Sequence, residues 1–554
     1  MGHRIRIVGS DTGSDRQHPD ATHDPLASMA ENMYTAYIRF LCNLPAFLKS
    51  RVSILQARQE IEKRLRCRED NFLSLIKLYI YRNSRSPYLP LLKAAACTYG
   101  DLEHEVKDKG LEAVLQQLQR EGVWISLEEF KGRQPIHRGH VELPVNSADF
   151  DRPHQTGGLR VTSGGTSGRS TGTKLDLPFT AARAAYDSVM FHMLGVHDAP
   201  VILWYPILPA STGIGNNLRY IKAGHPPTRW FNMVTYGQPR FKCETRLATN
   251  GIVWVSRLAG HTIPRPEDIP LAEVGRIADQ IAKFLKNKGR CVFQSYVSQA
   301  LRISKAVQER TGNMRGLTLI VGSEPLTKAK RREIASTGAN LYPRYFATEF
   351  GSIGMGCGNP EAIDDIHLMS DMLAMIQPGS VESGQTGPLF FTSLTPVMPK
   401  ILLNVQIGDM AVVSTKSCGC DFGKLGFATH LSRIRSYTRV TSQGMAIPQA
   451  MLEEIVDEQL IMKHGGTSLD YQWVEKEDAG GRTSLQLKIS PDVGPIDEKC
   501  IIQDILDGVR KKGKGEYMMA EIWSRSDAIS ICRETPQTTR RGKINPILRE
   551  RDQN

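Results

Sequence analysis

The chain has 554 residues, of which 40% are hydrophobic and 23% charged, and its formal net charge is +12. A chain of this length exceeds one ordinary hydrophobic core and fits a large α/β body with a smaller second domain. The positive charge lacks the aromatic and basic pattern of a nucleic-acid-binding module, so we expect no nucleic-acid partner. The most apolar run, residues 201–210, is too short to span a membrane. Ten irregularly spaced cysteines and a polar N-terminus without a secretory signal predict reduced thiols and a cytoplasmic location.

Apolar residues recur with a helical period along much of the chain after a polar segment, residues 1–30, that we expect to be disordered. Pro178 and Gly195 mark the first turn and the end of one of these helices, as the positional preferences of proline and glycine predict. Residues 201–208 are typical of a buried strand. The predicted helices span residues 32–83 with a break near Pro45, 111–121, 178–195 and 271–288.

A strand, a helix and a second strand follow closely at residues 317–321, 326–336 and 339–346. Such a βαβ unit implies a parallel sheet with a right-handed crossover. Residues 387–415 alternate as strands do, and from about residue 433 the pattern runs helix, strands, helix and a basic tail. The sequence therefore predicts an α/β fold with a large domain of layered sheets and helices, residues 31–431, and a smaller α+β domain, residues 432–554.

The densest run of hydroxyl and glycine residues lies at 161–173. Glycine allows backbone N–H groups to converge, and hydroxyls add further donors, so the segment suits an anion such as phosphate. It lacks the spacing of a Walker A loop, and a flexible polar surface loop is the alternative. The candidate phosphate-binding residues are Thr162, Ser163, Gly164, Gly165, Thr166, Ser167 and Gly168.

This run resembles the phosphate loop of the adenylate-forming enzymes, the superfamily of acyl-CoA synthetases and adenylation domains, with one extra residue and without the usual proline. Four further motifs of that superfamily follow in order. The resemblance implies that Gly322, Ser323, Glu324 and Pro325 form a turn against adenine. It also implies that Tyr345 stacks near adenine, Thr348 contacts the α-phosphate, Glu349 binds Mg²⁺, Asp409 accepts the ribose hydroxyls, and Lys543 bridges carboxylate and phosphate.

These roles suit the chemistry that the resemblance implies. Attack of a carboxylate on an α-phosphate brings two anions together, so catalysis requires positioning and charge neutralisation rather than a general base. Glu349 with Mg²⁺ and the ammonium group of Lys543 would neutralise the charge. Thr348 and the glycine-rich run would donate hydrogen bonds.

Within the superfamily the chain is most similar to phenylacetate–CoA ligases, at residues 86–95, 366–368, 387–395 and 417–420. It departs from the pattern at Gln406, where an arginine is expected, at the hinge 432–436, and at 442–445. Because the last two belong to the face used in the second half-reaction, adenylation is better supported than thioester formation. Four residues match Cys and His positions of the ligase pattern and suit structural Zn²⁺: Cys357, His367, Cys418 and Cys420. A reduced Cys-x-Cys turn with an unrelated histidine is the alternative.

The sequence therefore predicts an enzyme with the adenylate-forming fold, in which the small domain moves. With ATP and Mg²⁺ it would convert a carboxylic acid to an acyl-adenylate, release pyrophosphate, and transfer the acyl group to CoA. An amine or a carrier-protein thiol is the alternative acceptor, and a non-catalytic nucleotide-binding protein is the alternative class. Residues 204–215 and 293–298 are expected to line an apolar acid pocket. The acid itself and the oligomeric state are not predicted.

Overall fold

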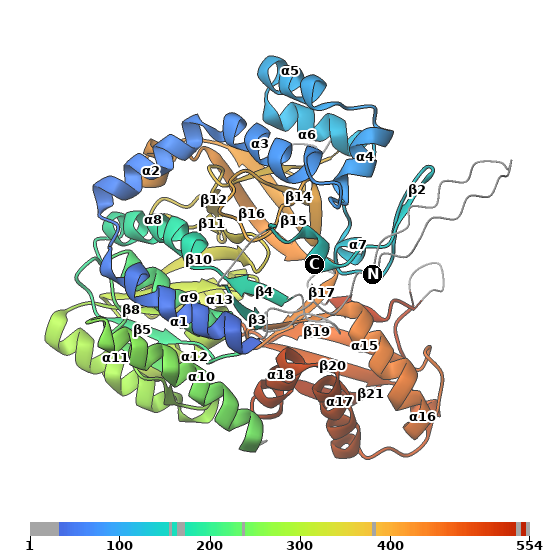
Figure 1. The fold of residues 1–554 in the computed structure, drawn as a ribbon. Coiled ribbons are helices and arrows are strands. Elements are labelled where there is room, and N and C mark those ends of the chain that lie inside the picture. The colour runs from blue at the N-terminus through green and yellow to red at the C-terminus, as the bar shows by residue number, and fades with distance from the viewer. Residues whose placement is uncertain are drawn as a thin grey trace, which may run out of the picture.

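The computed structural model describes residues 33–153, 158–162, 172–234, 239–378, 384–538 and 544–549. Within these residues, twelve strands form one mixed sheet that crosses the molecule. One half of the sheet is parallel, with helices on its faces, and the other half is antiparallel (Figure 1). The parallel strands in spatial order are β10 (Asn340–Ala347), β9 (Leu317–Gly322), β8 (Cys291–Tyr296), β5 (Val201–Trp204), β6 (Arg229–Asn232) and β7 (Glu267–Asp268).

The antiparallel half joins the parallel half where β10 pairs with β11. Its strands are β13 (Leu373–Ile376), β14 (Gly387–Ser393), β15 (Val405–Thr415), β16 (Thr429–Ser436), β12 (Ile366–Leu368) and β11 (Gly351–Met355). Strands β5, β8, β11, β12 and β13 are buried at every residue, whereas β7, β10 and β16 are mostly only partly buried. Strands with both faces covered read as continuous apolar runs, which is why β5 was recognisable in the sequence.

The predicted βαβ unit is confirmed, because β9 and β10 are parallel and α13 (Lys328–Ala335) connects them. Asp176 caps α8 (Leu177–Met193), and Pro178 lies in its first turn as predicted. Helix α8 runs through the interior and is buried on most sides, which makes its two charged residues, Arg183 and Asp187, unusual. The other helices beside the parallel strands are α9 (Ser211–Lys222), α10 (Pro239–Leu258), α11 (Val274–Lys288) and α12 (Val297–Thr311).

Two of the boundaries that differ from the prediction have a clear physical cause. The first helix, α1 (Met33–Lys49), continues through Pro45, and the break comes later, where Ser53 and Gln56 form a capping box that starts the next helix. Strand β5 ends at Trp204 instead of residue 208 because Pro206 has no N–H for the ladder. The other α-helices described before residue 159 are α2 (Ile54–Arg66), α3 (Arg68–Ile76), α4 (Tyr88–Ala94), α5 (Tyr99–Lys109), α6 (Leu111–Arg120) and α7 (Leu127–Phe130).

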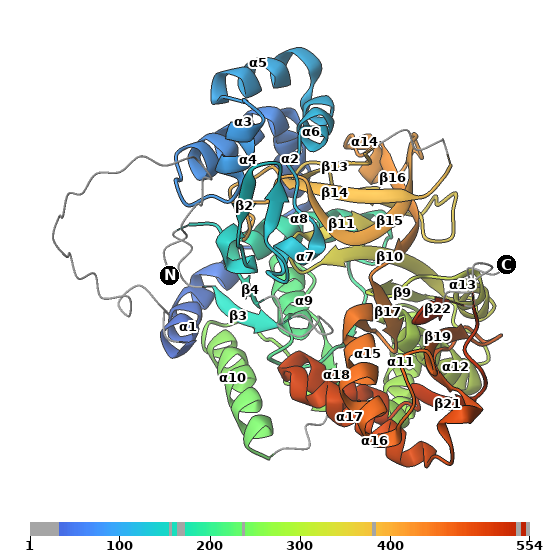
Figure 2. The ribbon, with the colours of Figure 1, turned by 90° about the vertical axis from the view of Figure 1, so that its right-hand side faces the viewer.

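The C-terminal elements form a separate four-stranded sheet covered by helices, at the lower right of Figure 1 and below the large sheet in Figure 2. A two-stranded hairpin, β17 (Arg439–Ser442) and β18 (Met445–Pro448), leads into it. The α+β character predicted for this part of the chain is confirmed. Its elements are α15 (Gln449–Ile455), α16 (Ile461–His464), β19 (Tyr471–Glu477), β20 (Thr483–Ile489), α17 (Glu498–Lys512), α18 (Lys514–Ser524), β21 (Ile529–Arg533) and β22 (Ile547–Arg549).

No helix among the described residues is both long and apolar enough to cross a bilayer.

Candidate functional site

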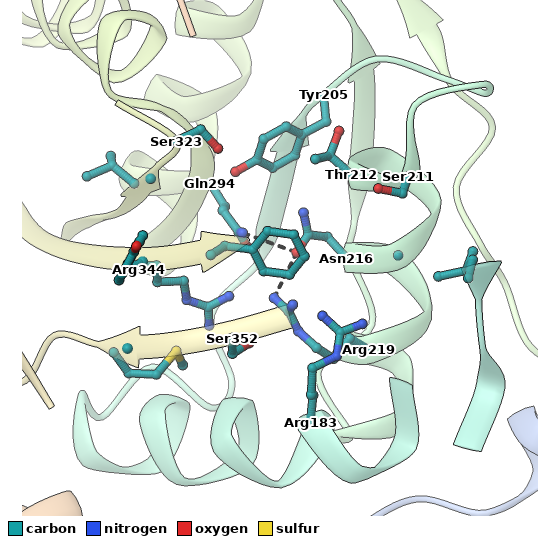
Figure 3. Close-up of a pocket in the computed structure, with 18 residues that line it drawn as sticks. Arg183, Tyr205, Ser211, Thr212, Asn216, Arg219, Gln294, Ser323, Arg344 and Ser352 are labelled. Carbon is teal, nitrogen blue, oxygen red and sulfur yellow. Dashed lines mark hydrogen bonds between the residues drawn. The ribbon is translucent and has the colours of Figure 1, made fainter. Parts of the chain in front are cut away.

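Two cavities lie side by side at the carboxyl ends of the parallel strands, where open α/β sheets place their ligands. The larger one, ≈ 760 Å³, lies between the large sheet and the C-terminal elements. The smaller one, ≈ 70 Å³, lies among α8, α9 and the central strands (Figure 3). Six residues line both cavities and form their common wall: Val321, Gly322, Ser323, Arg344, Tyr345 and Phe346.

The turn Gly322–Pro325 ends β9 and lies at this wall. Ser323 has a positive φ of 67°, a conformation that non-glycine residues adopt at few places other than tight turns and functional sites. The carboxylate of Glu324 accepts hydrogen bonds from the Ser298 N–H at 2.6 Å and hydroxyl at 2.7 Å, and from the Gly444 N–H at 2.6 Å. The side chain of Glu324 therefore joins the turn to the β17–β18 hairpin, a link that the sequence did not predict.

Tyr345 and Asp409 come together in the larger cavity. The hydroxyl of Tyr345 donates a hydrogen bond to Oδ2 of Asp409 at 2.6 Å. Burial raises the pKa of Asp409, and the neighbouring guanidinium of Arg439 opposes that rise. Arg439 is held by the Ile407 carbonyl at 2.9 Å. The sequence analysis did not predict Arg439. This residue supplies a positive charge near Asp409, whereas the arginine expected at position 406 is a glutamine.

Thr348 and Glu349 follow β10 in the turn to β11. Thr348 is half-buried, and Glu349 is only 6% exposed. Among the described residues, no side chain is hydrogen bonded to the Glu349 carboxylate. Burial and the charge of Arg439 lower the pKa of the nearby Lys131 to about 8, and the negative charge of Glu349 acts in the opposite direction. A buried carboxylate without a hydrogen-bonded partner suits a hard cation.

Several predicted residues lie outside the described residues, namely Ser163–Gly168 and Lys543. The strands on either side of the glycine-rich run are described: β3 (Leu159–Thr162) and β4 (Gly172–Leu175) pair in antiparallel register, with Thr162 opposite Gly172. Leu175, at the end of β4, lines the smaller cavity. The two ends of the glycine-rich run are thus held together beside the site.

The smaller cavity contains residues from both segments expected to form the acid pocket, including Tyr205, Thr212 and Gln294. The two segments therefore come together in one cavity, and charged side chains that the prediction did not include also line it. Three arginines line it, Arg183 from α8, Arg219 from α9 and Arg344 from β10, and no carboxylate of the described residues does. The signal in the sequence was the Arg183 and Asp187 pair, one helical turn apart in an otherwise apolar helix.

The four predicted zinc ligands also come together, around His367 of β12. The Sγ atoms of Cys357 and Cys418 are 3.9 Å apart, and Nε2 of His367 lies 3.3 Å from Sγ of Cys418 and 3.1 Å from Sγ of Cys420. All four ligand atoms lie within 4.8 Å of one another. The carbonyl of Phe427 lies 2.7 Å from Nδ1 of His367, which orients the ring and leaves Nε2 facing the thiols.

The β17–β18 hairpin contacts the site through residues 442–445, where the chain departs from the ligase pattern. Gln443, with φ of 55°, and Gly444 form the β17–β18 turn. Arg302 donates to Oε1 of Gln443 at 2.8 Å, and Gln299 donates to its carbonyl at 3.2 Å. The expected hinge residues 432–436 lie within β16 of the large sheet, where Arg433 has a φ of 51°.

No protein-family model matches the chain, and no curated protein sequence matches it. Among solved structures, a 2-hydroxyisobutyryl-CoA ligase, in complex with 2-HIB-AMP and CoA in the thioesterification state, is 14% identical. It aligns with 87% of this chain and 90% of its own, with a TM-score of 0.51. An o-succinylbenzoate CoA synthetase from Bacillus subtilis aligns with 70% of this chain and 68% of its own, at 11% identity and a TM-score of 0.43. An amide bond synthetase from Marinactinospora thermotolerans aligns over the same shares, at 12% identity and a TM-score of 0.42.

The architecture is that of a two-part α/β protein with its site at the junction between a large sheet and a smaller α+β unit. The chain has the fold of the adenylate-forming enzymes. The closer likeness to phenylacetate–CoA ligases and the domain boundary near residue 431 stay predictions.

Proposed function

We propose that this protein is an AMP-forming ligase that activates a carboxylic acid with ATP and then transfers the acyl group to CoA. One observation carries the proposal: a nucleotide-sized cavity bearing Tyr345 and Asp409 shares its wall with a smaller cavity suited to an acid. Their common wall at Ser323 and Tyr345 is where the two reactants would meet. The complexes formed by the structural relatives, with acyl-AMP and CoA, agree with this order of events.

The described residues would divide the work as follows. Asp409 would hold the ribose, the Gly322–Pro325 turn would lie against adenine, and Thr348 would donate a hydrogen bond to the α-phosphate. Glu349 would bind Mg²⁺, which neutralises phosphate charge in such reactions. Lys543 and the run from Thr162 to Gly168 would complete the charge neutralisation as the acid carboxylate attacks the α-phosphate and pyrophosphate leaves.

A screen of acids for ATP-dependent pyrophosphate release, run with and without CoA, tests the proposal. We expect release to require an acid and a thioester to form when CoA is present. An amine is the alternative acceptor, so a parallel panel of amines would separate the two acceptors. Pyrophosphate release that is independent of any acid would contradict the proposal.

We further propose that the β17–β18 turn is positioned for acyl transfer. Gly444 has a φ of 84°, and a Cβ atom there would overlap the ring of Tyr296. Gly444→Ala is therefore expected to slow transfer from a supplied acyl-adenylate about tenfold or more, since overpacking costs about 1–3 kcal/mol. Acid-dependent pyrophosphate release should change less, and stopped-flow measurement of each half-reaction checks this.

Gly465→Ala is the matched control, because Gly465 also has a positive φ, of 81°, but a Cβ atom would meet nothing within 4 Å. Equal losses in the two variants would show that backbone strain, rather than docking of the hairpin, causes the defect.

We propose that Cys357, His367, Cys418 and Cys420 bind one structural Zn²⁺. In a tetrahedral zinc site with Zn–S of about 2.3 Å and Zn–N of about 2.0–2.1 Å, the ligand atoms are about 3.4–3.8 Å apart. The distances of 3.9, 3.3 and 3.1 Å between these atoms are close to these values. None of the ten cysteines forms a disulfide, and we propose a cytoplasmic location, where thiols stay reduced.

Metal analysis of the purified protein is expected to give about one zinc per chain. Cys420→Ala should lose the metal and lower the melting temperature, while Cys532→Ala, which removes a thiol outside this cluster, should keep both. Zinc content near zero in the wild-type protein after growth and purification with added zinc would contradict the site.

A further inference from the structure

The three arginines of the smaller cavity carry more positive charge than the one carboxylate beside them, Asp187, can balance. Asp187, only 1% exposed, accepts hydrogen bonds from Arg219 through Oδ2 and from Arg344 through Oδ1. Both oxygens of this carboxylate are thereby used. Asn216 accepts a second bond from Arg219 at 2.8 Å. Three guanidinium groups therefore lie near one carboxylate, and Arg183 is the one that Asp187 does not bind.

Arg183 is 6% exposed and has no ion pair or hydrogen bond to any residue that the structure describes. Its guanidinium carbon lies 4.4 Å from the ring centroid of Phe179 and 5.6 Å from that of Phe346. The other acid near it, Asp176, is occupied, because it caps α8 through the Phe179 N–H at 2.8 Å and pairs with Arg152 at 3.1 Å. Burial, together with the charge of Arg219, lowers the pKa of Arg183 to about 9.

An unpaired buried cation destabilises a fold by several kcal/mol, and it persists when a ligand supplies its counter-charge. Figure 3 shows the side chains of Arg183, Arg219 and Arg344 gathered along one side of the cavity, opposite Tyr205 and Ser323. Arg344 belongs to the wall shared with the larger cavity, whereas Arg183 and Arg219 line the smaller cavity alone. The surplus charge therefore lies away from the end at which the acid would react.

We propose that the acid substrate carries a second anionic group, which pairs with Arg183 while the first carboxylate reacts at the shared wall. The inference rests on the proposed function and specifies its substrate class. The cavity volume of ≈ 70 Å³ is roughly five to seven times the space that one water requires, so the substrate is short. Short dicarboxylic acids fit both requirements.

The test compares succinate, glutarate and adipate with their monomethyl esters in pyrophosphate release. The esters keep the shape and remove one charge, and loss of one partner of a buried charge pair lowers kcat/KM by about 30-fold or more. We expect the wild-type enzyme to prefer the diacids to their esters by this factor. The preference should be nearly lost in Arg183→Leu and partly retained in Arg183→Lys. Arg290→Leu, at an arginine whose side chain is 45% exposed, should keep it in full. Phosphono- and sulfo-acids of equal length distinguish a carboxylate from another second anion.

Thermal unfolding supplies a second readout that does not need turnover. Without ligand, Arg183→Leu should melt at a higher temperature than the wild type, because an unpaired buried charge is removed. The diacid, and not its ester, should raise the melting temperature of the wild type.

Diacids and esters that are used equally, with no difference in melting, would overturn the proposal. So would an equal rise in KM for ATP with every acid in Arg183→Leu, which would place Arg183 on the polyphosphate. If no acid supports pyrophosphate release but diacids still stabilise the wild type, the proposed function fails and the anion site stands.

Discussion

Replacing Lys543 with alanine is expected to slow acid-dependent pyrophosphate release by about 10²–10³-fold, the usual consequence of losing one focused charge contact in a closed site. Lys543 lies outside the described residues, so this expectation comes from the C-terminal Gly542-Lys543 motif. A lysine is a compact charge on a flexible stem and suits the bridging of two anions. Transfer from a supplied acyl-adenylate should be much less affected, because the moving domain has by then withdrawn the lysine.

Lys511→Ala serves as the matched control, since Lys511 is an exposed lysine in the last turn of α17. Rapid-quench measurement of both half-reactions in the two variants decides the matter. Equal losses in adenylation and transfer would indicate a structural role for the tail, and full activity in both would remove Lys543 from the site.

Glu349→Gln should reduce adenylation by about 10²-fold or more at ordinary Mg²⁺ concentration, because a metal ion contributes several kcal/mol of charge stabilisation to phosphoryl chemistry. Glutamine keeps the shape of the buried side chain and removes its charge. The concentration of Mg²⁺ that gives half-maximal rate should rise, which separates loss of a metal ligand from loss of folding. Activity that survives unchanged would mean that Glu349 binds no metal.

Glu309→Gln is a suitable control for this variant, because Glu309 is exposed on α12 and belongs to none of the predicted motifs. Its Mg²⁺ dependence should equal that of the wild type. A parallel shift in both variants would attribute the effect to the overall charge of the protein.

Local patterns in the sequence predicted much of the fold because its strands and helices are bounded by strong signals. The βαβ unit was recognisable from a buried apolar strand, a short helix and a second strand. The helix break was placed wrongly near Pro45, because α1 continues through that proline and the capping box at Ser53 starts the next helix. Signals of this kind act over a few residues, so the presence of a helix or strand is easier to predict than the residue at which it ends.

The candidate site was only partly predictable because its contacts join distant segments. Glu324 and Gly444 are 120 positions apart, and nothing in either motif indicated their hydrogen bond. The arginine cluster combines α8, α9 and β10, so the charge of the acid pocket could not be read from the two segments expected to form it. The Cys-x-Cys at 418–420 was visible locally, but Cys357 and His367 reach it only through the pairing of β11, β12 and β16.

In the proposed reaction the carboxylate oxygen of the acid attacks the α-phosphate of ATP. An acid labelled with ¹⁸O in the carboxylate tests this directly, with mass spectrometry of the nucleotide product after acyl transfer. The proposed reaction leaves one labelled oxygen on AMP, because the carboxylate oxygen forms the bond to phosphorus and the C–O bond breaks during transfer. Unlabelled AMP, or ADP with the label in inorganic phosphate, would contradict it.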